Sequence, residues 1–570
     1  MITLLKRRLS FTGTTLVRLS GEIRGLHAAA YVLAGSALLS SLLALFRDRI
    51  LASTFGAGYK LDLYYAAFRI PDLLFVIFGG LVSVYVLIPA LARRTETEQR
   101  AYIDTILLGF SLLVLVATAT TWMVAPYLLS RFFPAIVAGV YGDQLVVLTR
   151  LLLAQPILLA ASNIVAAITQ SRHRYLLYAA SPIVYNLGII FGLVVLYPLF
   201  GLRGVVGGVL IGALLHLFIQ LPSAWRDGFF QVLPRFRDWR GFFDTVRISI
   251  PRAAALSIGQ ITFLGLMSFA GLLAAGSISI FVFAYNLQAV PLAIIGASYS
   301  VAAFPSIAAA FGSGKRTEFL NNVYEAARQI LFWSLPATAL LIVLRAHLVR
   351  TVLGAGAFDW TDTRLTAAAV ALFAFSLTAQ GLSLLVVRAC YAAGKTLVPF
   401  VIALFSGALA LLLGTIFLRM FAYDETGAFI EVLLRVEDVA GSDMLALVLA
   451  YSASMIVSAL LYVAYFEIRF GHFISEISRA WWQGLTAAFV GALATYGTLY
   501  ILGDITFAST LVSVFLRGFL AGVVGIIAIS MTYRQLGSRE YAAAIEGSRK
   551  RFWREAKPVS SAEAAEVPRV

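Results

Sequence analysis

The chain has 570 residues, of which 60% are hydrophobic and 13% are charged, and its mean hydropathy is +0.88. A soluble protein with a large core is excluded, because repeated apolar runs are long enough to cross the roughly 30 Å hydrocarbon layer of a bilayer. The lone cysteine, Cys390, excludes an internal disulfide framework and a cysteine-rich metal site, and the net charge of +15 must be located along the chain before it is interpreted.

The apolar runs predict an all-α integral membrane protein with about fourteen transmembrane helices. A basic segment, residues 1–27, precedes the first run and has no clear cleavage site, so we expect the first helix to be retained. The predicted helices cover residues 28–46, 63–92, 104–128, 146–170, 176–200, 204–223, 248–273, 277–310, 327–346, 363–387, 397–418, 443–466, 481–501 and 511–533.

Lysine and arginine alternate between the predicted loops. Most of the 44 basic residues precede the first helix, occupy every second loop or follow residue 533, whereas the long loop 419–442 is acidic. The positive-inside rule therefore predicts that both termini are cytoplasmic and that loop 419–442 is outside. The basic surplus is then a topology signal, and we expect no nucleic-acid partner.

An internal repeat divides the chain. Gly79 and Gly296 differ by 217 positions, Pro182 and Pro399 also differ by 217, and Pro89 precedes Pro305 by 216. Such a register predicts two pseudo-symmetric six-helix lobes around a central cavity, related by an axis along the membrane normal. The expected segments are an N-lobe at 28–223, a cytoplasmic linker at 224–247, a C-lobe at 248–466, two further helices at 481–533 and a cytoplasmic tail at 534–570.

Charge concentrates in residues 45–80, "LFRDRILASTFGAGYKLDLYYAAFRIPDLLFVIFGG". Asp62, Arg69 and Asp72 fall on nearly one helical face. Each charge facing lipid at mid-depth would cost roughly 2.5 to 3.5 kcal/mol, so this stripe is expected to face protein or a water-filled cavity. Lys60 is more simply interpreted as an interfacial anchor.

The same stretch contains residues that favour bending. Gly56 and Gly58 predict a flexible turn between the first two helices, while Pro71 removes a backbone hydrogen bond inside the second helix. Gly79 and Gly80 weaken that helix again, so we expect these five positions to act as hinges.

The stretch "FRDRILASTFGAGYKLDLYYAAFRIPDLL" resembles the helix 1 to 2 signature of the MurJ (MviN) lipid II flippases, a family of the multidrug/oligosaccharidyl-lipid/polysaccharide exporter superfamily. Two later stretches, "GAGAFDWTDTRLTAAAVALFAFSL" and "RACYAAGKTLVPF", are similar to further motifs of that family. The resemblance spans about residues 28–535. It implies a bacterial inner-membrane transporter that moves the undecaprenyl-diphosphate-linked peptidoglycan precursor by alternating access between two lobes.

The resemblance implies that arginines bind the diphosphate, since a guanidinium pairs with phosphate oxygens bidentately. The matching positions are Arg47, Arg49 and Arg69, with Arg252 as an embedded cation from the other lobe. Asp48 and Asp62 are expected to orient these arginines. The implied partners are the lipid-linked substrate, membrane lipids and cell-wall synthesis proteins.

The chain departs from the family where arginines or a glutamate are missing. Ser41, Phe75 and Asn286 stand where the family has arginine, and Gly80 stands where it has glutamate. These departures leave open an exporter of another lipid-linked oligosaccharide or of drugs, and a transport-inactive scaffold for cell-wall enzymes. An enzyme is not expected, because the histidines are scattered without a metal or catalytic motif, and no cofactor is predicted.

The predicted topology can be tested by cysteine accessibility. A Ser560→Cys variant should resist a membrane-impermeant thiol reagent in intact cells and react after lysis, because the tail is expected inside. Labelling of intact cells would contradict the fourteen-helix arrangement.

Overall fold

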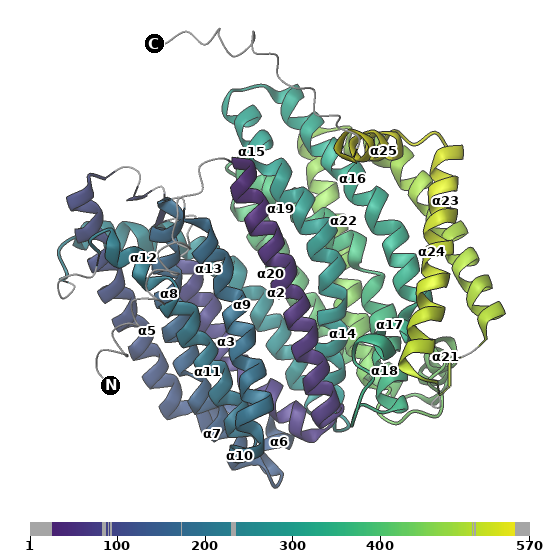
Figure 1. The fold of residues 1–570 in the computed structure, drawn as a ribbon, viewed down its shortest axis with the longest axis horizontal. Coiled ribbons are helices and arrows are strands. Elements are labelled where there is room, and N and C mark those ends of the chain that lie inside the picture. Colours follow the sequence, from purple (N-terminus) through teal and green to yellow (C-terminus); the bar gives the residue numbers. More distant parts are fainter. Residues whose placement is uncertain are drawn as a thin grey trace, which may run out of the picture.

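A computed structural model describes residues 26–82, 87–88, 90–91, 94–172, 174–229, 235–503, 505–506 and 509–552. Within these ranges the regular structure is helical throughout (Figure 1). The helices of the first half are α2 (Leu26–Phe55), α3 (Tyr59–Leu81), α5 (Glu96–Phe132), α6 (Pro134–Ala138), α7 (Gly142–Leu152), α8 (Ala154–Ser171), α9 (Tyr175–Phe191), η1 (Gly192–Leu196), α10 (Tyr197–Phe200), α11 (Leu202–Phe218) and α12 (Leu221–Arg226).

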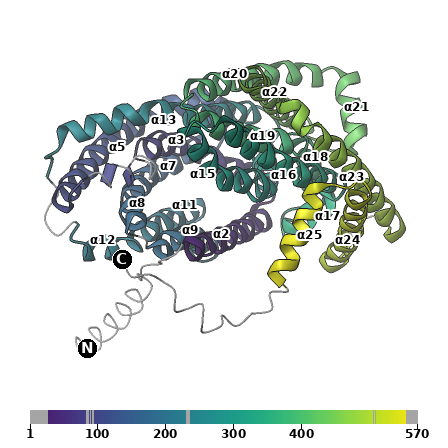
Figure 2. The same ribbon diagram turned by 90° about the horizontal axis from the view of Figure 1, so that it is seen from above.

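The second half begins with the long helix α13. Its helices are α13 (Trp239–Ala270), α14 (Ser277–Leu292), η2 (Ala293–Ala297), α15 (Ser298–Gly312), α16 (Arg316–Val343), α17 (Arg345–Val352), α18 (Trp360–Ala374), α19 (Leu377–Ala392), α20 (Leu397–Phe421), α21 (Asp424–Leu434), α22 (Met444–Phe470), α23 (Phe473–Leu502), α24 (Leu511–Gln535) and α25 (Arg539–Phe552). In Figure 2, the view from above, α25 lies at the periphery, and it packs on α16 and α24.

The predicted membrane class is confirmed, whereas the count of fourteen spans is not. Within the described residues, eleven helices are long and apolar enough to cross a membrane, or twelve if the bent pair α18 and α19 is one span. The first two predicted spans correspond to α2 and α3, which are not among these eleven. Helix α3 carries Lys60, Asp62, Arg69 and Asp72 within 23 residues, so it depends on protein partners for its charges.

Several helix bounds differ from the prediction. Helix α2 continues through the charged residues to Phe55, nine residues beyond the expected end, because its charged side chains find partners on other helices. Helix α13 begins at Trp239, inside the expected linker. The expected outer loop contains α21, and the expected tail contains α25.

Three spans have an irregular point near their middle. Helix α14 passes through the π-helical turn η2 directly after Pro291, and α9 passes through the π-helical turn η1. Helices α18 and α19 meet at an angle of 44°. A proline and a π-helical turn each interrupt the regular hydrogen-bond ladder, so these are points at which a helix bends most easily.

Helix packing follows the internal repeat. Helix α2 packs on α9, and α13, its counterpart one repeat later, packs on α20; α9 packs on α11 as α20 packs on α22. Helix α13 also packs along α3, so it joins the two halves.

The α9–α11 contact of the first half is built from glycines. A Cβ atom at Gly188 would lie 2.4 Å from the Cα of Gly212, and one at Gly192 would lie 2.6 Å from the Cα of Gly208. The backbones therefore approach too closely for any side chain, an arrangement that gives helices in a bilayer extensive van der Waals contact.

The buried apolar side chains of the described residues form one cluster shared by both halves, two further large clusters and a small one around Phe332 and Tyr533. The largest cluster contains α3, α7, α11, α13, α14, α18 and α22 residues and so spans both halves. Two other large clusters each belong mainly to one half, around Phe110 and Ile164 in the first and around Phe319 and Phe466 in the second. The largest cluster thus joins the halves at the end that holds the α2–α3 turn, lower in Figure 1, which we call the turn end. We call the other the far end, where α13 continues to contact α3 and α5.

The glycine contact predicts a sharp difference between two substitutions. Gly188→Val should destabilise the folded protein by about 1 to 3 kcal/mol or more, because the added side chain must displace the α11 backbone. Gly497→Val is the control, since no atom lies within 4 Å of its Cβ position. Thermal unfolding in detergent measures both, and equal midpoints would contradict the packing.

Candidate functional site

The charged residues of α2 begin a polar chain that crosses the molecule. Arg47 donates to Asp48 from Nε at 3.0 Å and from Nη2 at 2.7 Å, and its Nη1 donates to Asn186 of α9 at 3.2 Å. The other carboxylate oxygen of Asp48 accepts from Asn286 of α14 at 3.0 Å. Asp48 is 3% exposed, so α2 carries a buried ion pair that links α9 to α14.

Asn286 is one of the positions at which the resemblance implies an arginine in the family. Here its amide serves as the neutral partner of Asp48. An arginine at this position would bring a second positive charge to the same carboxylate, whereas the amide leaves Arg47 as the cation that neutralises Asp48. The asparagine therefore keeps the polar chain connected and brings no positive charge of its own.

Arg69 lies on α3 between an acidic residue and an aromatic ring. Its Nη2 is 3.7 Å from Asp72, its Nε donates to the Tyr65 carbonyl at 3.0 Å, and its guanidinium carbon lies 5.0 Å from the ring centroid of Phe263 on α13. The side chain of Arg69 is 12% exposed and that of Asp72 is 28% exposed. The Arg69–Asp72 contact is longer than a hydrogen bond, so the guanidinium keeps donors available for an incoming anion.

Asp62 has partners that the sequence did not predict, and its expected role in orienting the arginines stays a prediction. Its carboxylate accepts from the backbone N–H of Gly276 at 2.6 Å and from the backbone N–H of Ser279 at 2.8 Å, and it also accepts from the Ser279 hydroxyl. Because Gly276 is the N-cap of α14, Asp62 of the first half closes the amino-terminal end of a helix from the second half. Its described partners belong to α14, so it holds the halves together.

Arg49 also contacts the second half. Its Nη1 donates to the carbonyls of Thr351 at 2.6 Å and Val352 at 3.1 Å, at the carboxyl end of α17. A cation at this position satisfies free carbonyls and complements the negative end of the helix dipole. The substrate-binding role of Arg49 stays a prediction, and the structure adds a second role in joining the halves.

The α2–α3 turn is held by hydrogen bonds to the segment around the start of α18. Ala57 donates to Asp362 of α18 at 2.9 Å, and Ala357 donates to the Ser53 carbonyl at 2.9 Å. Gly56 has φ +62°, and a Cβ atom there would lie 2.7 Å from the Ala357 carbonyl oxygen. Gly56 is therefore needed for a fixed close approach in this state.

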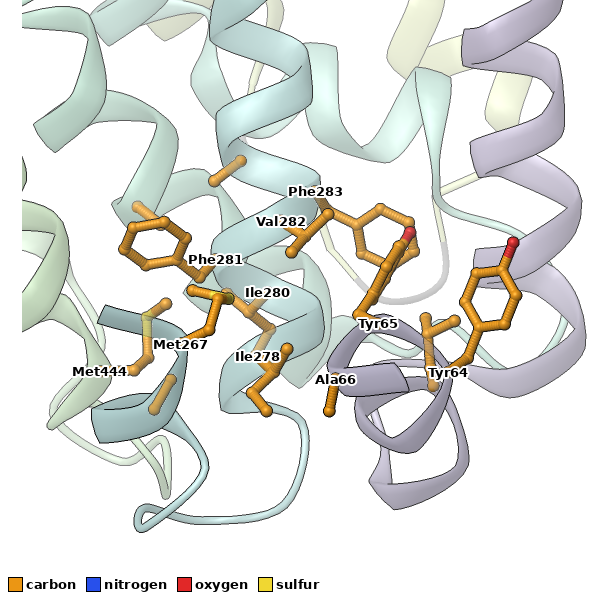
Figure 3. Close-up of a cluster of buried hydrophobic side chains, with 14 of the residues drawn as sticks. Tyr64, Tyr65, Ala66, Met267, Ile278, Ile280, Phe281, Val282, Phe283 and Met444 are labelled. Atoms are coloured by element: carbon orange, nitrogen blue, oxygen red, sulfur yellow. The ribbon is translucent and has the colours of Figure 1, made fainter. Parts of the chain in front are cut away.

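An aromatic layer backs these polar contacts. Figure 3 shows Tyr65 of α3 beside Phe283 of α14, with Tyr64 on the side of α3 that faces away from α14. The rings of Tyr65 and Phe283 meet edge to face, with centroids 6.0 Å apart. The turn end is thus closed by polar contacts and by packed apolar side chains together.

The remaining predicted residues have varied positions. Lys60 is exposed at the start of α3, and the Arg252 side chain lies outside the described residues. Pro71, Gly79 and Gly80 lie in α3, which continues unbroken to Leu81. Their hinge role and the hydrated cavity among α2, α3, α13 and α14 stay predictions.

Two residues of the site were not predicted from the sequence: Ser279, which contacts Asp62, and Asp362, which contacts Ala57. The repeat offered a signal for the first, because Asp62 and Ser279 are 217 positions apart, which equals the repeat shift. Asp362 lies in one of the quoted motifs, but its contact with Ala57 joins segments 305 positions apart and has no local signature. Among the described residues, no cluster of three histidine, cysteine, aspartate or glutamate side chains could hold a metal ion.

The Arg49 contact can be separated from the predicted cargo role by measuring stability. Arg49→Ala should lower the free energy of unfolding by about 1 to 2 kcal/mol, because the α17 carbonyls lose their cation. Lys60→Ala, which removes an exposed charge at the same end, should leave stability unchanged. If Arg49→Ala has unchanged stability but no longer binds cargo, the structural role is contradicted and Arg49 is a ligand of the cargo headgroup.

Comparisons with known proteins agree with this architecture. Residues 51–521 match the family model described as "Lipid II flippase MurJ". A "Probable lipid II flippase MurJ" of Thermotoga maritima is 28% identical over 372 residues, which cover 63% of this chain and 73% of that protein. One from Buchnera aphidicola of Acyrthosiphon pisum is 27% identical over 380 residues, covering 65% and 74%.

Solved structures show the same fold. One titled "Lipid II flippase MurJ, inward closed conformation" has a TM-score of 0.70 at 21% identity and covers 89% of this chain and 99% of its own. An inward-facing multidrug resistance MATE family transporter of the MOP superfamily has a TM-score of 0.62 at 15% identity, with 78% and 99% covered. Since the family model matches most of the sequence, the chain belongs to the MurJ family of lipid II flippases.

Proposed function

We propose that this chain moves the undecaprenyl-diphosphate-linked peptidoglycan precursor, lipid II, across the bacterial inner membrane. Family membership supplies the cargo class. The observation that carries the mechanism is the arrangement of apolar clusters, which are shared by both halves at the turn end and mainly confined to one half elsewhere. A transporter that alternates between two openings needs halves that can part at either end.

The proposed orientation places both termini in the cytoplasm, so the turn end is outside. Asp62, Arg49 and Asp362 then hold the outer side closed, and the cargo enters from the cytoplasmic side. In this state the precursor's diphosphate is expected to reach Arg47 and Arg69, each of which has an acidic neighbour.

The acidic neighbours give these arginines a reversible site. A bound diphosphate would compete with Asp48 for Arg47 and with Asp72 for Arg69, and the carboxylates would recover their partners when the cargo leaves. Arg252 is proposed to add a cation from α13. The carboxylates thus limit the affinity, which a transporter needs for release.

Opening of the outer side requires α14 to leave Asp62. The π-helical turn η2 allows the first part of this helix to move separately from α15. In the proposed cycle the lobes rock about the bent helix α14 and the hinge residues of α3. Membrane lipids surround the spans, and cell-wall synthesis proteins are proposed to receive the cargo.

Arg69 provides the sharpest test of the cargo site. Arg69→Ala should reduce cargo affinity about tenfold to a hundredfold, the value of a charge-assisted hydrogen bond of roughly 1.5 to 3 kcal/mol. Arg69→Lys should also impair flipping, because lysine offers a point charge in place of a planar fork. The measurement is flipping of a labelled lipid-linked precursor in vesicles.

Lys60→Ala is the matched control and should flip at the wild-type rate. Membrane abundance must be confirmed for each variant. If the Arg69→Ala variant flips the precursor normally at wild-type abundance, Arg69 does not bind the diphosphate. The chain would then be an exporter of another cargo or a scaffold for cell-wall enzymes.

A further inference from the structure

A basic cavity lies at the far end of the second half, away from the proposed cargo arginines. Its volume is about 290 Å³, and it is lined by three cationic side chains, Arg316, Lys395 and Arg469, and by the aromatic residues Phe311, Phe319 and Phe470. No acidic side chain lines this cavity. Lys395 belongs to the motif "RACYAAGKTLVPF", which the proposed transport mechanism does not use.

Three separate chain segments build the cavity. Arg316 begins α16 after a turn in which Gly314 has φ +74°, and Lys395 follows Gly394, which has φ +70°, between α19 and α20. Arg469 lies in the last turn of α22. Residues with a left-handed backbone are usually glycine, so these turns are specified by the sequence.

The aromatic residues form a packed floor. Phe319 lies 5.3 Å from Phe311 and 5.3 Å from Phe470, measured between ring centroids. The Arg316 side chain crosses this floor and donates from Nη2 to the Phe470 carbonyl at 3.3 Å. The cavity thus has a rigid apolar base under a cationic rim.

The electrostatics of the rim favour an anion. Among the described residues, no carboxylate lies within 4.0 Å of the charged nitrogens of Arg316, Lys395 or Arg469; the neighbouring Lys315 pairs with Glu318 at 3.2 Å. Like charges that share a cavity repel each other, and an anion between them removes that repulsion. The amino-terminal end of α16 lies at the same cavity and adds the positive partial charge of the helix dipole.

Membrane topology alone does not explain why these three basic residues line one cavity. The positive-inside rule explains why loops on the cytoplasmic side carry lysine and arginine. It places no demand on three such residues from three different turns to line one cavity, without a carboxylate and over an aromatic floor. Convergence of this kind is typical of a phosphate-binding site.

We propose that this cavity binds a phosphate group, held by Arg316, Lys395 and Arg469, with the carbon part of the ligand on the phenylalanine floor. The ligand is the phosphate headgroup of an anionic membrane lipid or a free phosphate. Because its residues come from the α15–α16 turn, the α19–α20 turn and the end of α22, the bound phosphate ties together three ends of the second half.

The test uses the full-length chain in nanodiscs of two compositions. In phosphatidylcholine nanodiscs the thermal midpoint is measured against inorganic phosphate, and in a second series against a rising fraction of phosphatidylglycerol. A saturable rise is expected in at least one series. A rise with inorganic phosphate identifies a soluble ligand, and a rise with phosphatidylglycerol alone identifies a lipid headgroup.

Variants decide whether the response comes from this cavity. Lys395→Gln and Arg469→Gln should each weaken the apparent affinity about tenfold, and Lys395→Arg should retain most of it. Arg534→Gln is the matched control, because it removes one exposed charge at the end of α24, outside the cavity lining, and should bind like the wild type. Each variant changes one side chain, so the test does not depend on a multiple variant that fails to fold.

The proposal is overturned if neither series shows a saturable rise. It is also overturned if Lys395→Gln and Arg469→Gln respond like the wild type, or if Arg534→Gln loses as much affinity as they do, since bulk attraction of anions would then explain the result.

Discussion

The first turn of α14 depends on a residue from the other half of the molecule. Its N–H groups have no carbonyl partner within the helix, and Asp62 of α3 satisfies those of Gly276 and Ser279. Asp62 is 5% exposed, so water has little access to these N–H groups and cannot easily take the place of the carboxylate as their acceptor. Two further features belong to the same contact in this state. A Cβ atom at Gly276 would lie 2.2 Å from the Ala57 carbonyl oxygen, and the largest apolar cluster spans both halves.

The same contact sets the energetic demand on transport. Separation of the halves would expose a carboxylate with two backbone N–H groups and leave the α17 carbonyls without Arg49. Hydrogen bonds to charged groups contribute about 1.5 to 3 kcal/mol each, so the closed state is stabilised by several such terms, offset in part by hydration after opening. Bound cargo must favour the open state by a comparable amount, since a ligand shifts an equilibrium only through its differential affinity.

The sequence predicted the class of fold and much of the repeat, because both depend on long-range composition and on the spacing of glycine and proline. It located the charged stretch, but it did not indicate that Asp62 contacts the start of α14 or that Arg49 reaches α17. Local pattern cannot reveal such contacts, because they join residues 217 and 302 positions apart. Gly314 and Gly394 are local signals for two turns. The cavity that the two turns form together cannot be predicted from them, because the turns are far apart in the sequence.

The meeting of Asp62 with Ser279 also constrains how such a chain can have arisen. These residues occupy equivalent positions of the two repeats, and they touch where the repeats face each other. In a symmetric pair of identical ancestral subunits, each position would meet its own copy, so an aspartate would face an aspartate and the two charges would repel. Fusion of two copies into one chain removes that restriction. One repeat can then keep the carboxylate while the other supplies the hydroxyl, a division of labour that no homodimer could adopt.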